Sequence, residues 1–480
     1  DAFHRAQNVP SISHTRMSST AGNDSASIPG RAGGLVGVFD SLKLIADPLG
    51  FLKKWRERHG MVFQTTQFFR PTVVLGDPKA VEDFSSKEAD ITGLALPEAF
   101  RTLQTEYSSL NQDGDRLKAS RKIFQGILNS EKYAEYLPAI EQSIDRLLDT
   151  VADKGEMLVA DELDATFLQL FGRIFCGRSL SLDDIQMFKD YNTGLFALGL
   201  WDPQFKTAQA ALGTLVAANI EALQQARARD FSGPLDGMWK VLTASVDETG
   251  HVISDERCAT AGVIFTWGAY AEQSALCGLA LVELGKRPDI AERVRAEARA
   301  AGVLGASAPL TLPGLSSLPY ADAVLNEVLR YHCQTGGGFR AATADLEIAG
   351  YKIPKGTVVS PDTRLPNLSP DYHPSPDTFE PARWVLPDQL PSVTGETAKQ
   401  CPFTGAAASL SQYVFFPGGT GAHQCPGIPL AMLVGRLTMV KWLDRFDSWG
   451  PDDPAKPVPM IEIPIRRPAA EYKITLKLRT

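Results

Sequence analysis

Residues Phe415 to Gly427 read FFPGGTGAHQCPG and place one cysteine, Cys425, in a loop crowded with glycine and proline. An apolar pattern with the period of a helix follows at once from Ile428. A thiolate at a helix N-terminus is stabilised by the helix dipole and by N–H groups that point at the sulfur. On its own, such a loop more often holds a plain buried cysteine. With partner motifs elsewhere, it favours a cysteine that ligates haem iron.

Two motifs upstream of the loop decide between these interpretations. Residues 327–330 read EVLR on a helical pattern, and residues 379–384 read FEPARW between that helix and the cysteine loop. In order and spacing, the three motifs resemble those of the cytochrome P-450 family of haem-thiolate enzymes. The resemblance is firm from about Ala261 onward and continuous from Ile28. It implies the mainly helical cytochrome P-450 fold with a small β region, and haem b bound through Cys425 as the metal ligand.

The composition is that of a globular protein large enough to enclose a cofactor. The chain has 480 residues and a net charge of −8, without a basic stripe, which argues against nucleic acid as a partner. Its six cysteines lack the paired spacing of a zinc site or a disulfide framework (positions 176, 258, 277, 333, 401 and 425). They indicate a reducing compartment, and we expect a soluble intracellular protein of the cytoplasm or a plastid.

The N-terminal part of the chain differs from the rest. Residues 1–27 are polar and rich in serine, and we expect a flexible tail or the remnant of a transit peptide. No linker divides residues 28–480, which predicts a single haem-thiolate catalytic domain. No segment approaches the ~18 apolar residues that span a bilayer. A transmembrane anchor is therefore not expected, while peripheral contact with a membrane stays open.

Periodicity predicts the order of the elements. The predicted helices are 48–59, 78–86, 114–128, 132–153, 158–175, 182–195, 204–228, 255–287, 288–302 and 320–332. Two strands are expected within 62–75, a hairpin within 346–359, and strands after residue 444, with turns at Arg70-Pro71 and at Gly350. Residues 28–37 are expected to be an irregular entry segment, 91–110 a loop beside a pocket, and 385–411 a surface loop.

The resemblance assigns haem contacts to the cysteine loop and to one upstream arginine. Gly421 and Gly427 match the glycines of the family's loop. His423 and Arg340 are expected to bind the haem propionates through charge-assisted hydrogen bonds. Seven residues before the cysteine, where the family usually has Phe, this chain has Gly418. The ring that normally packs near the sulfur is therefore missing, which affects tuning of the iron and not its ligation.

Charged residues elsewhere are expected to have two roles. A cation on the predicted helix 114–128 matches a further propionate partner of the family, and Lys118 and Arg121 are the two candidates. Glu327, Arg330 and Arg383 resemble the family's buried ion-pair triad, whose role is structural. Glu and Arg three residues apart lie on the same side of a helix.

The predicted helix 255–287 departs from the family pattern at its centre. Oxygen-activating members carry an acid followed by Thr, and counting back from the end of the helix places these on Ala271 and Glu272. The pair, which helps to deliver protons, is therefore absent. Glu272 and Thr266 are the predicted catalytic residues, although Glu272 could instead hydrogen-bond a loosened turn of the helix. The predicted substrate pocket consists of Leu94, Leu96, Phe100, Trp267, Tyr270, Gly337 and Phe339.

The missing pair favours a lipid hydroperoxide as substrate, because its O–O bond is already reduced. Segments around Asn326, Gln424 and Leu433 also resemble the family branch that transforms fatty acid hydroperoxides. We therefore expect rearrangement of polyunsaturated fatty acid hydroperoxides by O–O homolysis, without O2, NADPH or a redox partner. Epoxyalcohol synthase activity is preferred, with allene oxide synthase and hydroperoxide lyase activities close behind. Two alternatives stay open, a reductase-dependent monooxygenase and a haem sensor without turnover.

Overall fold

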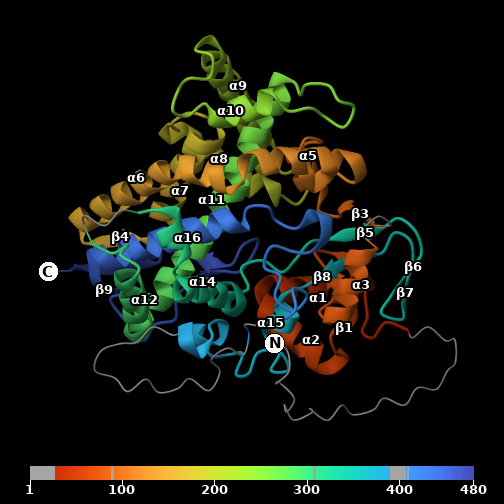
Figure 1. Cartoon of the computed structure of the whole chain (residues 1–480). Coiled ribbons are helices and arrows are strands. Elements are labelled where there is room, and N and C mark those ends of the chain that lie inside the picture. The colour runs from red at the N-terminus through yellow and green to blue at the C-terminus, as the bar shows by residue number, and fades with distance from the viewer. Residues whose placement is uncertain (1–26, 88–90, 306–309, 390–406, 408–409, 480) are drawn as a thin grey trace, which may run out of the picture.

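The computed structural model describes residues 27–87, 91–305, 310–389, 407 and 410–479, and within them the fold is mainly helical with small β-sheets (Figure 1). The longer helices are α1 (Gly34–Ala46), α2 (Pro48–His59), α3 (Pro78–Ser86), α5 (Gly114–Ile127), α6 (Ser130–Lys154), α7 (Val159–Phe175), α8 (Leu182–Leu195), α9 (Pro203–Ala228), α11 (Asp255–Lys286), α12 (Pro288–Ala300), α14 (Pro319–His332) and α16 (Ile428–Arg445). The shorter helices are α4 (Glu98–Leu103), α10 (Gly237–Thr243), α13 (Leu312–Ser316) and α15 (Arg364–Asn367). The predicted helices are confirmed to within a few residues at their ends.

The strands form one larger sheet and three small ones among the described residues. They are β1 (Val62–Gln67), β2 (Arg70–Leu75), β3 (Ile91–Leu94), β4 (Glu156–Leu158), β5 (Arg340–Ala342), β6 (Leu346–Ile348), β7 (Tyr351–Ile353), β8 (Val358–Pro361), β9 (Phe446–Gly450), β10 (Met460–Ile461), β11 (Arg467–Pro468) and β12 (Lys473–Leu478). The larger sheet has the order β1-β2-β8-β5-β3, with only β2 and β8 parallel, and lies at the lower right of Figure 1.

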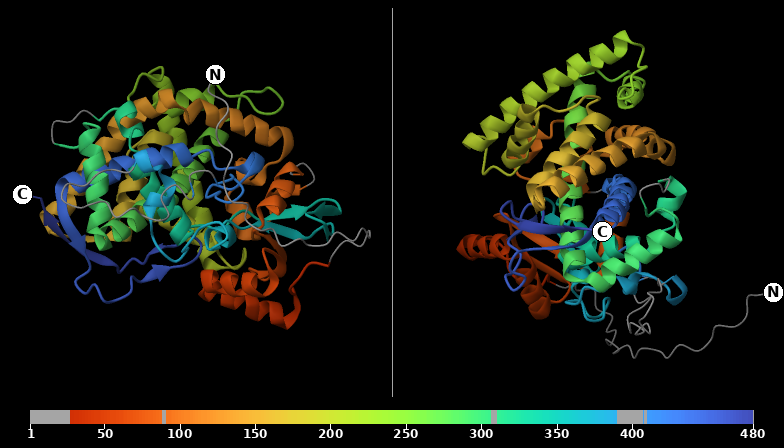
Figure 2. Two further views of the ribbon diagram at one scale, coloured as in Figure 1. Left: turned by 60° about the horizontal axis from the view of Figure 1, so that its bottom comes forward. Right: turned by 90° about the vertical axis from the view of Figure 1, so that its left-hand side faces the viewer.

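Helix α11 is the central element and passes through the middle of the molecule (Figure 2). It packs against α7, α9, α14 and α16. Ser254 caps its N-terminus by accepting a hydrogen bond from the N–H of Arg257. Because other helices surround it, α11 is apolar or small on nearly every side, and most of its residues are buried.

Two local predictions near the N-terminus are wrong. The turn between β1 and β2 is made by Phe68 and Phe69, whose φ angles of 47° and 62° are left-handed, and Arg70 already begins β2. The predicted irregular entry segment contains the start of α1. In α1 the polar residues Asp40 and Ser41 are buried, while Leu35 and Phe39 are exposed. The helix therefore lacks the periodic apolar face by which a sequence indicates a helix.

Further differences lie in the predicted loops. Residues 91–110 include β3 and α4. Most of the surface loop predicted at 385–411 and residues 1–26 of the predicted tail lie outside the described residues. No described helix is long and apolar enough to cross a membrane.

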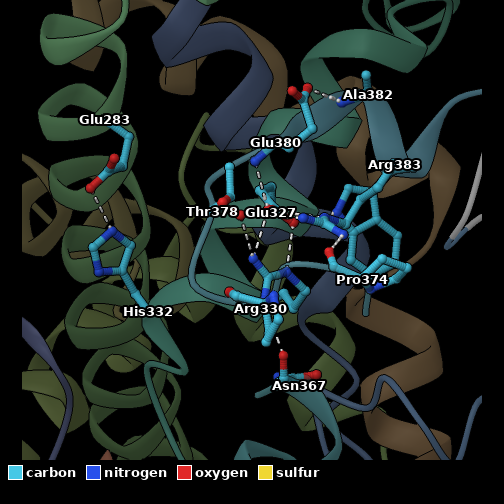
Figure 3. A network of polar contacts seen from close by, with 12 residues as sticks. Glu283, Glu327, Arg330, His332, Asn367, Pro374, Thr378, Glu380, Ala382 and Arg383 are labelled. Atoms are coloured by element: carbon cyan, nitrogen blue, oxygen red, sulfur yellow. Dashed lines mark hydrogen bonds and ion pairs between the residues drawn. The ribbon is translucent and has the colours of Figure 1, made fainter. Parts of the chain in front are cut away.

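The charged triad forms a buried cluster at the end of α14 (Figure 3). The carboxylate of Glu327 accepts hydrogen bonds from Arg330 at 2.7 and 2.8 Å and from Arg383 at 3.1 Å, and all three residues are fully buried. It also accepts the Trp384 indole N–H at 2.9 Å. The ring of Trp384 lies 4.5 Å from that of Phe415, between centroids. The cluster thereby fixes the segment that supports the start of the cysteine loop.

Candidate active site

The cysteine loop folds back on itself before α16 begins. The N–H of Cys425 donates to the carbonyl of Gly418 at 2.7 Å, and Gly419 and Gly421 adopt left-handed φ angles of 77° and 69°. A Cβ added at Gly418 would lie 3.1 Å from the Cβ of Cys425 and 2.9 Å from Ile428. Gly418 stands where the family usually has Phe, and in this loop a larger side chain at position 418 would displace Cys425 and Ile428.

The sulfur of Cys425 meets the requirements of a thiolate ligand. Of the five cysteines that the structure describes, Cys425 alone is exposed, and it lines a cavity of about 360 Å³ together with Arg121, Gly421 and Gln424. The N–H of Gly427 donates to the sulfur at 3.4 Å. Burial raises the pKa of the thiol, while the Gly427 N–H and the positive charge of Arg121 act to lower it. The overall effect is a raised pKa. The N–H groups and Arg121 are placed to hold the thiolate once haem iron, which itself favours the deprotonated sulfur, would bind it.

A second surface faces this sulfur from α11. Phe265, Gly268, Ala269 and Glu272 are partly exposed on a helix that is otherwise mostly buried. Their spacing of three and four residues places them on one face. The charge of Glu272 raises the pKa of the Cys425 thiol, so this face and the cysteine loop are close enough to interact. The small side chains at 268 and 269 fit the close approach of a flat group.

Glu272 is held by a residue that the sequence did not indicate. The amide nitrogen of Gln334, Nε2, donates to the main-chain carbonyl of Glu272 at 3.0 Å and to its carboxylate Oε2 at 3.1 Å. Burial raises the pKa of Glu272 to about 7, and the hydrogen bond from Gln334 acts to lower it. At neutral pH this carboxyl is therefore poised between its neutral and its charged form.

Two predicted site residues of α11 point elsewhere. Thr266 is fully buried, and its hydroxyl donates to the carbonyl of Phe171 at 3.3 Å and lies 3.3 Å from the sulfur of Cys176. Tyr270 is 2% exposed and belongs to the main hydrophobic core. Both side chains pack away from the exposed face of α11, so the structure does not bring Thr266 or Tyr270 to this surface. The catalytic role of Thr266 and the pocket position of Tyr270 stay predictions without support from this geometry.

The structure separates the two candidate cations of α5. The Lys118 side chain is 77% exposed and pairs with Asp115 at 2.8 Å, and it does not line the cavity at Cys425. Arg121 instead lines the cavity next to Cys425, with its guanidinium 5.7 Å from the centroid of the Phe124 ring. Arg121 remains the candidate haem contact of this helix.

The two other predicted propionate partners are both held by nearby groups. Nε2 of His423 lies 2.9 Å from the carbonyl of Gln112 and 3.7 Å from the carboxylate of Asp113. Arg340 is 6% exposed on β5 and donates to the carbonyl of Phe339 at 3.4 Å. Both residues occupy fixed positions at elements that lead to the site, and their contact with haem stays a prediction.

Part of the predicted pocket comes together above α11. The ring of Phe100 lies 5.9 Å from Trp267 and 5.7 Å from Phe196, and Leu96 packs on the same cluster. The indole N–H of Trp267 donates to Asn192 at 3.0 Å, which fixes the ring. Phe196 and Asn192 are residues of this cluster that the sequence did not reveal, because they lie at the end of another helix.

The remaining predicted pocket residues lie along the sheet. The ring of Phe339 packs edge-on against Phe68 at 5.6 Å. Gly337 has a φ angle of 155° and its backbone lies tightly against the carbonyl of Pro361, so only glycine fits there. Leu94 on β3 is paired with Arg340 on β5.

Fold and site together define a haem-thiolate enzyme. The family model for cytochrome P450 matches residues 34–476, and the chain belongs to this family. Haem b, ligated by a cysteine thiolate, is its cofactor, and Cys425 is the predicted ligand.

Relatives and a solved structure agree with this assignment. The chain is 27% identical to cytochrome P450 120 of Synechocystis sp. over 428 residues, covering 88% of this chain and 91% of the relative. It is 26% identical to cytochrome P450 26B1 of Mus musculus (82% and 76% covered) and 26% identical to ent-kaurenoic acid oxidase of Oryza sativa subsp. japonica (81% and 75%). The solved structure of retinoic acid bound cyanobacterial CYP120A1 has a TM-score of 0.79 at 24% identity, covering 92% of this chain and 96% of that chain.

These relatives correct the predicted function. None of the three is named as a hydroperoxide isomerase or lyase, and one is named as an oxidase. Rearrangement of fatty acid hydroperoxides is therefore the wrong prediction. The expectation that no redox partner is required depended on it and is wrong as well.

Proposed function

We propose that this chain is a monooxygenase that receives electrons from a separate reductase and hydroxylates a large apolar carboxylic acid. Membership of the cytochrome P450 family supports the reaction class. One relative is named as an oxidase of ent-kaurenoic acid, and the similar solved structure has retinoic acid bound. Both compounds are large and mostly apolar carboxylic acids, which supports this substrate class.

Glu272 is the observation that carries the proposed reaction type. Hydroxylation of a substrate RH consumes O2, two electrons and two protons, and gives ROH and H2O. The haem supplies the activation of oxygen when bound. Of the four residues on the exposed face of α11, Glu272 alone can titrate, and with a pKa of about 7 it can accept and release a proton at neutral pH. It can therefore supply protons without the usual acid–alcohol pair.

The aromatic cluster supports an apolar substrate. Phe100, Phe196 and Trp267 are in ring contact beside the exposed face of α11. Apolar pockets bind through the area that they remove from water, and a few polar groups then fix the orientation. We expect the apolar part of the acid to lie against this cluster, with the carbon to be hydroxylated near Glu272.

The test is turnover of the purified holoenzyme with NADPH and a cytochrome P450 reductase, or with ferredoxin and its reductase. Retinoic acid and ent-kaurenoic acid are the first substrates to try. With isotope-labelled dioxygen, we expect a hydroxylated product that carries one labelled oxygen atom. Omitting NADPH should abolish the product.

The matched comparison uses linoleic acid hydroperoxide without NADPH. Fast loss of the hydroperoxide, together with no labelled product from either acid and either electron-transfer system, would overturn the proposed function. In the E272Q variant we expect NADPH oxidation to continue with less product per NADPH, because a proton donor is missing while electron delivery is unchanged. The thiolate spectrum of this variant should match that of the wild type.

A further inference from the structure

The contact between Gln334 and Glu272 joins two separate elements. Gln334 lies two residues after the end of α14, whereas Glu272 lies in the middle of α11. One amide nitrogen donates to two oxygen atoms of Glu272, at 3.0 Å to the main chain and 3.1 Å to the carboxylate. The main-chain carbonyl can only accept, so the amide must present its nitrogen to this side in both protonation states of Glu272.

Gln334 is itself held in place. Gln334 is 5% exposed, and its main-chain carbonyl accepts the main-chain N–H of Arg466 at 2.9 Å. Before it, Cys333 caps the C-terminus of α14 in the left-handed conformation with φ 48°, which sets the direction of the chain. A buried amide on a fixed backbone loses little further freedom when it holds a partner, so the contact with Glu272 is favourable.

The oxygen of the same amide gives a second observation. Oε1 of Gln334 is buried and has no hydrogen-bond partner among the described residues. A buried acceptor left unpaired is costly, so its presence requires a reason other than packing. The gain from the two bonds that Nε2 makes to Glu272 provides that reason.

We propose that Gln334 is a positioning residue that holds the carboxyl of Glu272 toward the cysteine loop and favours its charged form. This rests on the proposed function, because it deepens the role of Glu272 in proton supply. An amide that donates to a carboxylate stabilises the ionised state more than the neutral one. Without this donor, the carboxyl would stay protonated to higher pH and could adopt other rotamers.

Few charged groups near Glu272 compete with this effect. From the cysteine loop, Cys425 faces Glu272. His332 and Glu283 form a buried pair, in which Nε2 of the histidine lies 2.9 Å from Oε1 of the glutamate (Figure 3). The guanidinium of Arg466 lies 3.3 Å from Nδ1 of the same histidine. Gln334 is the group whose hydrogen bond opposes the burial of Glu272.

The experiment is an infrared pH titration of the ferric holoenzyme. The C=O band of a protonated buried carboxyl is assigned to Glu272 by its loss in E272Q. In Q334M, which keeps the length of the side chain and removes the donor, we expect the midpoint of this band to rise by about one pH unit, a tenfold change in proton affinity. Q273M, which removes a neighbouring buried amide that bonds Cys277 and not Glu272, is the matched control and should leave the midpoint unchanged.

The outcomes separate this inference from the proposed function. A wild-type midpoint in Q334M, with an intact thiolate spectrum, would overturn the positioning role. If Q334M does not fold, Q334N serves in its place, since a side chain shorter by one methylene withdraws the same amide and should shift the midpoint in the same direction. If no acid is hydroxylated under any condition, the proposed function fails, whereas the infrared titration still decides whether Gln334 controls Glu272. A rise of the midpoint in Q273M equal to that in Q334M would also overturn the inference.

Discussion

Replacing Glu272 by Gln removes a titrating group from α11 while keeping its size and its ability to accept a hydrogen bond from Gln334. Burial raises the pKa of Glu272 from 4.5 to about 7, so the folded protein holds a proton that the unfolded chain releases. Stability from this proton is therefore greatest at low pH and is lost as the pH rises through about 7. At 1.36 kcal/mol per pH unit the full effect is about 3.4 kcal/mol, of which about 2.5 kcal/mol falls between pH ~5 and ~8.

The assay is guanidinium chloride unfolding of the holoenzyme at pH ~5 and ~8, followed by loss of the haem absorption band and by fluorescence. Taking the difference in free energy of unfolding between E272Q and wild type at each pH removes the contribution of the other carboxyls, which both proteins share. On going from the lower to the higher pH, we expect E272Q to gain about 2.5 kcal/mol in free energy of unfolding relative to wild type. E57Q, which removes an exposed charge on α2, controls for the change in net charge. An E272Q difference that is the same at both pH values would refute the reasoning.

Three further predictions follow from the geometry. C425S should abolish the haem-thiolate spectrum of the carbon monoxide complex, and a retained spectrum would contradict the ligand assignment. R121M should speed transfer of haem to apomyoglobin by about tenfold, the value of one charge-assisted hydrogen bond, while K118M should not; equal rates in the two variants would exclude Arg121 as a haem contact. If the exposed apolar side chains of α1 contact a membrane, L35D/F39D should reduce flotation with anionic vesicles, and wild-type protein that does not float would contradict this contact.

The parts of the site that could be predicted from the sequence are those encoded within a few residues. The cysteine loop carries its own turn glycines and the start of α16, so Cys425, Gly421 and Gly427 follow from a short segment. The Glu327 cluster is recognisable because its two arginines lie in two short motifs of fixed order. Local sequence is sufficient in both cases because each motif forms its own backbone geometry.

The face of α11 could not be predicted in the same way. A helix surrounded by other helices is apolar or small on all sides, so its periodicity does not indicate which residues face the site. Thr266 and Tyr270 are four residues apart and share a buried face, whereas Phe265, Gly268 and Glu272 share the exposed one. The prediction combined residues from both faces. Gln334 could not be predicted for a related reason. It is a polar residue after the end of a helix, and the sequence around it does not indicate a contact with a carboxyl on a distant helix.

The error in the predicted function arose at the same place. The predicted function equates loss of the acid–alcohol pair with loss of proton delivery, which favours a substrate that needs no protons. In the structure Glu272, which stands at the place of the alcohol, supplies an acid on the exposed face of α11, and its pKa is near neutrality. The resemblance around Gln424 involved a few residues beside the ligand, and similarity over more than 400 residues to other family members outweighs it.

Both sides of the site depend on the Glu327 cluster. Arg330 fixes the last turn of α14, after which the chain leads directly to Gln334 and hence to the carboxyl of Glu272. The same carboxylate of Glu327 binds Trp384, whose ring supports Phe415 at the start of the cysteine loop. A change that loosens this cluster should therefore disturb the thiolate ligand and the distal acid together. Replacing Gln334 should disturb the acid alone, because the cluster and the cysteine loop keep their contacts.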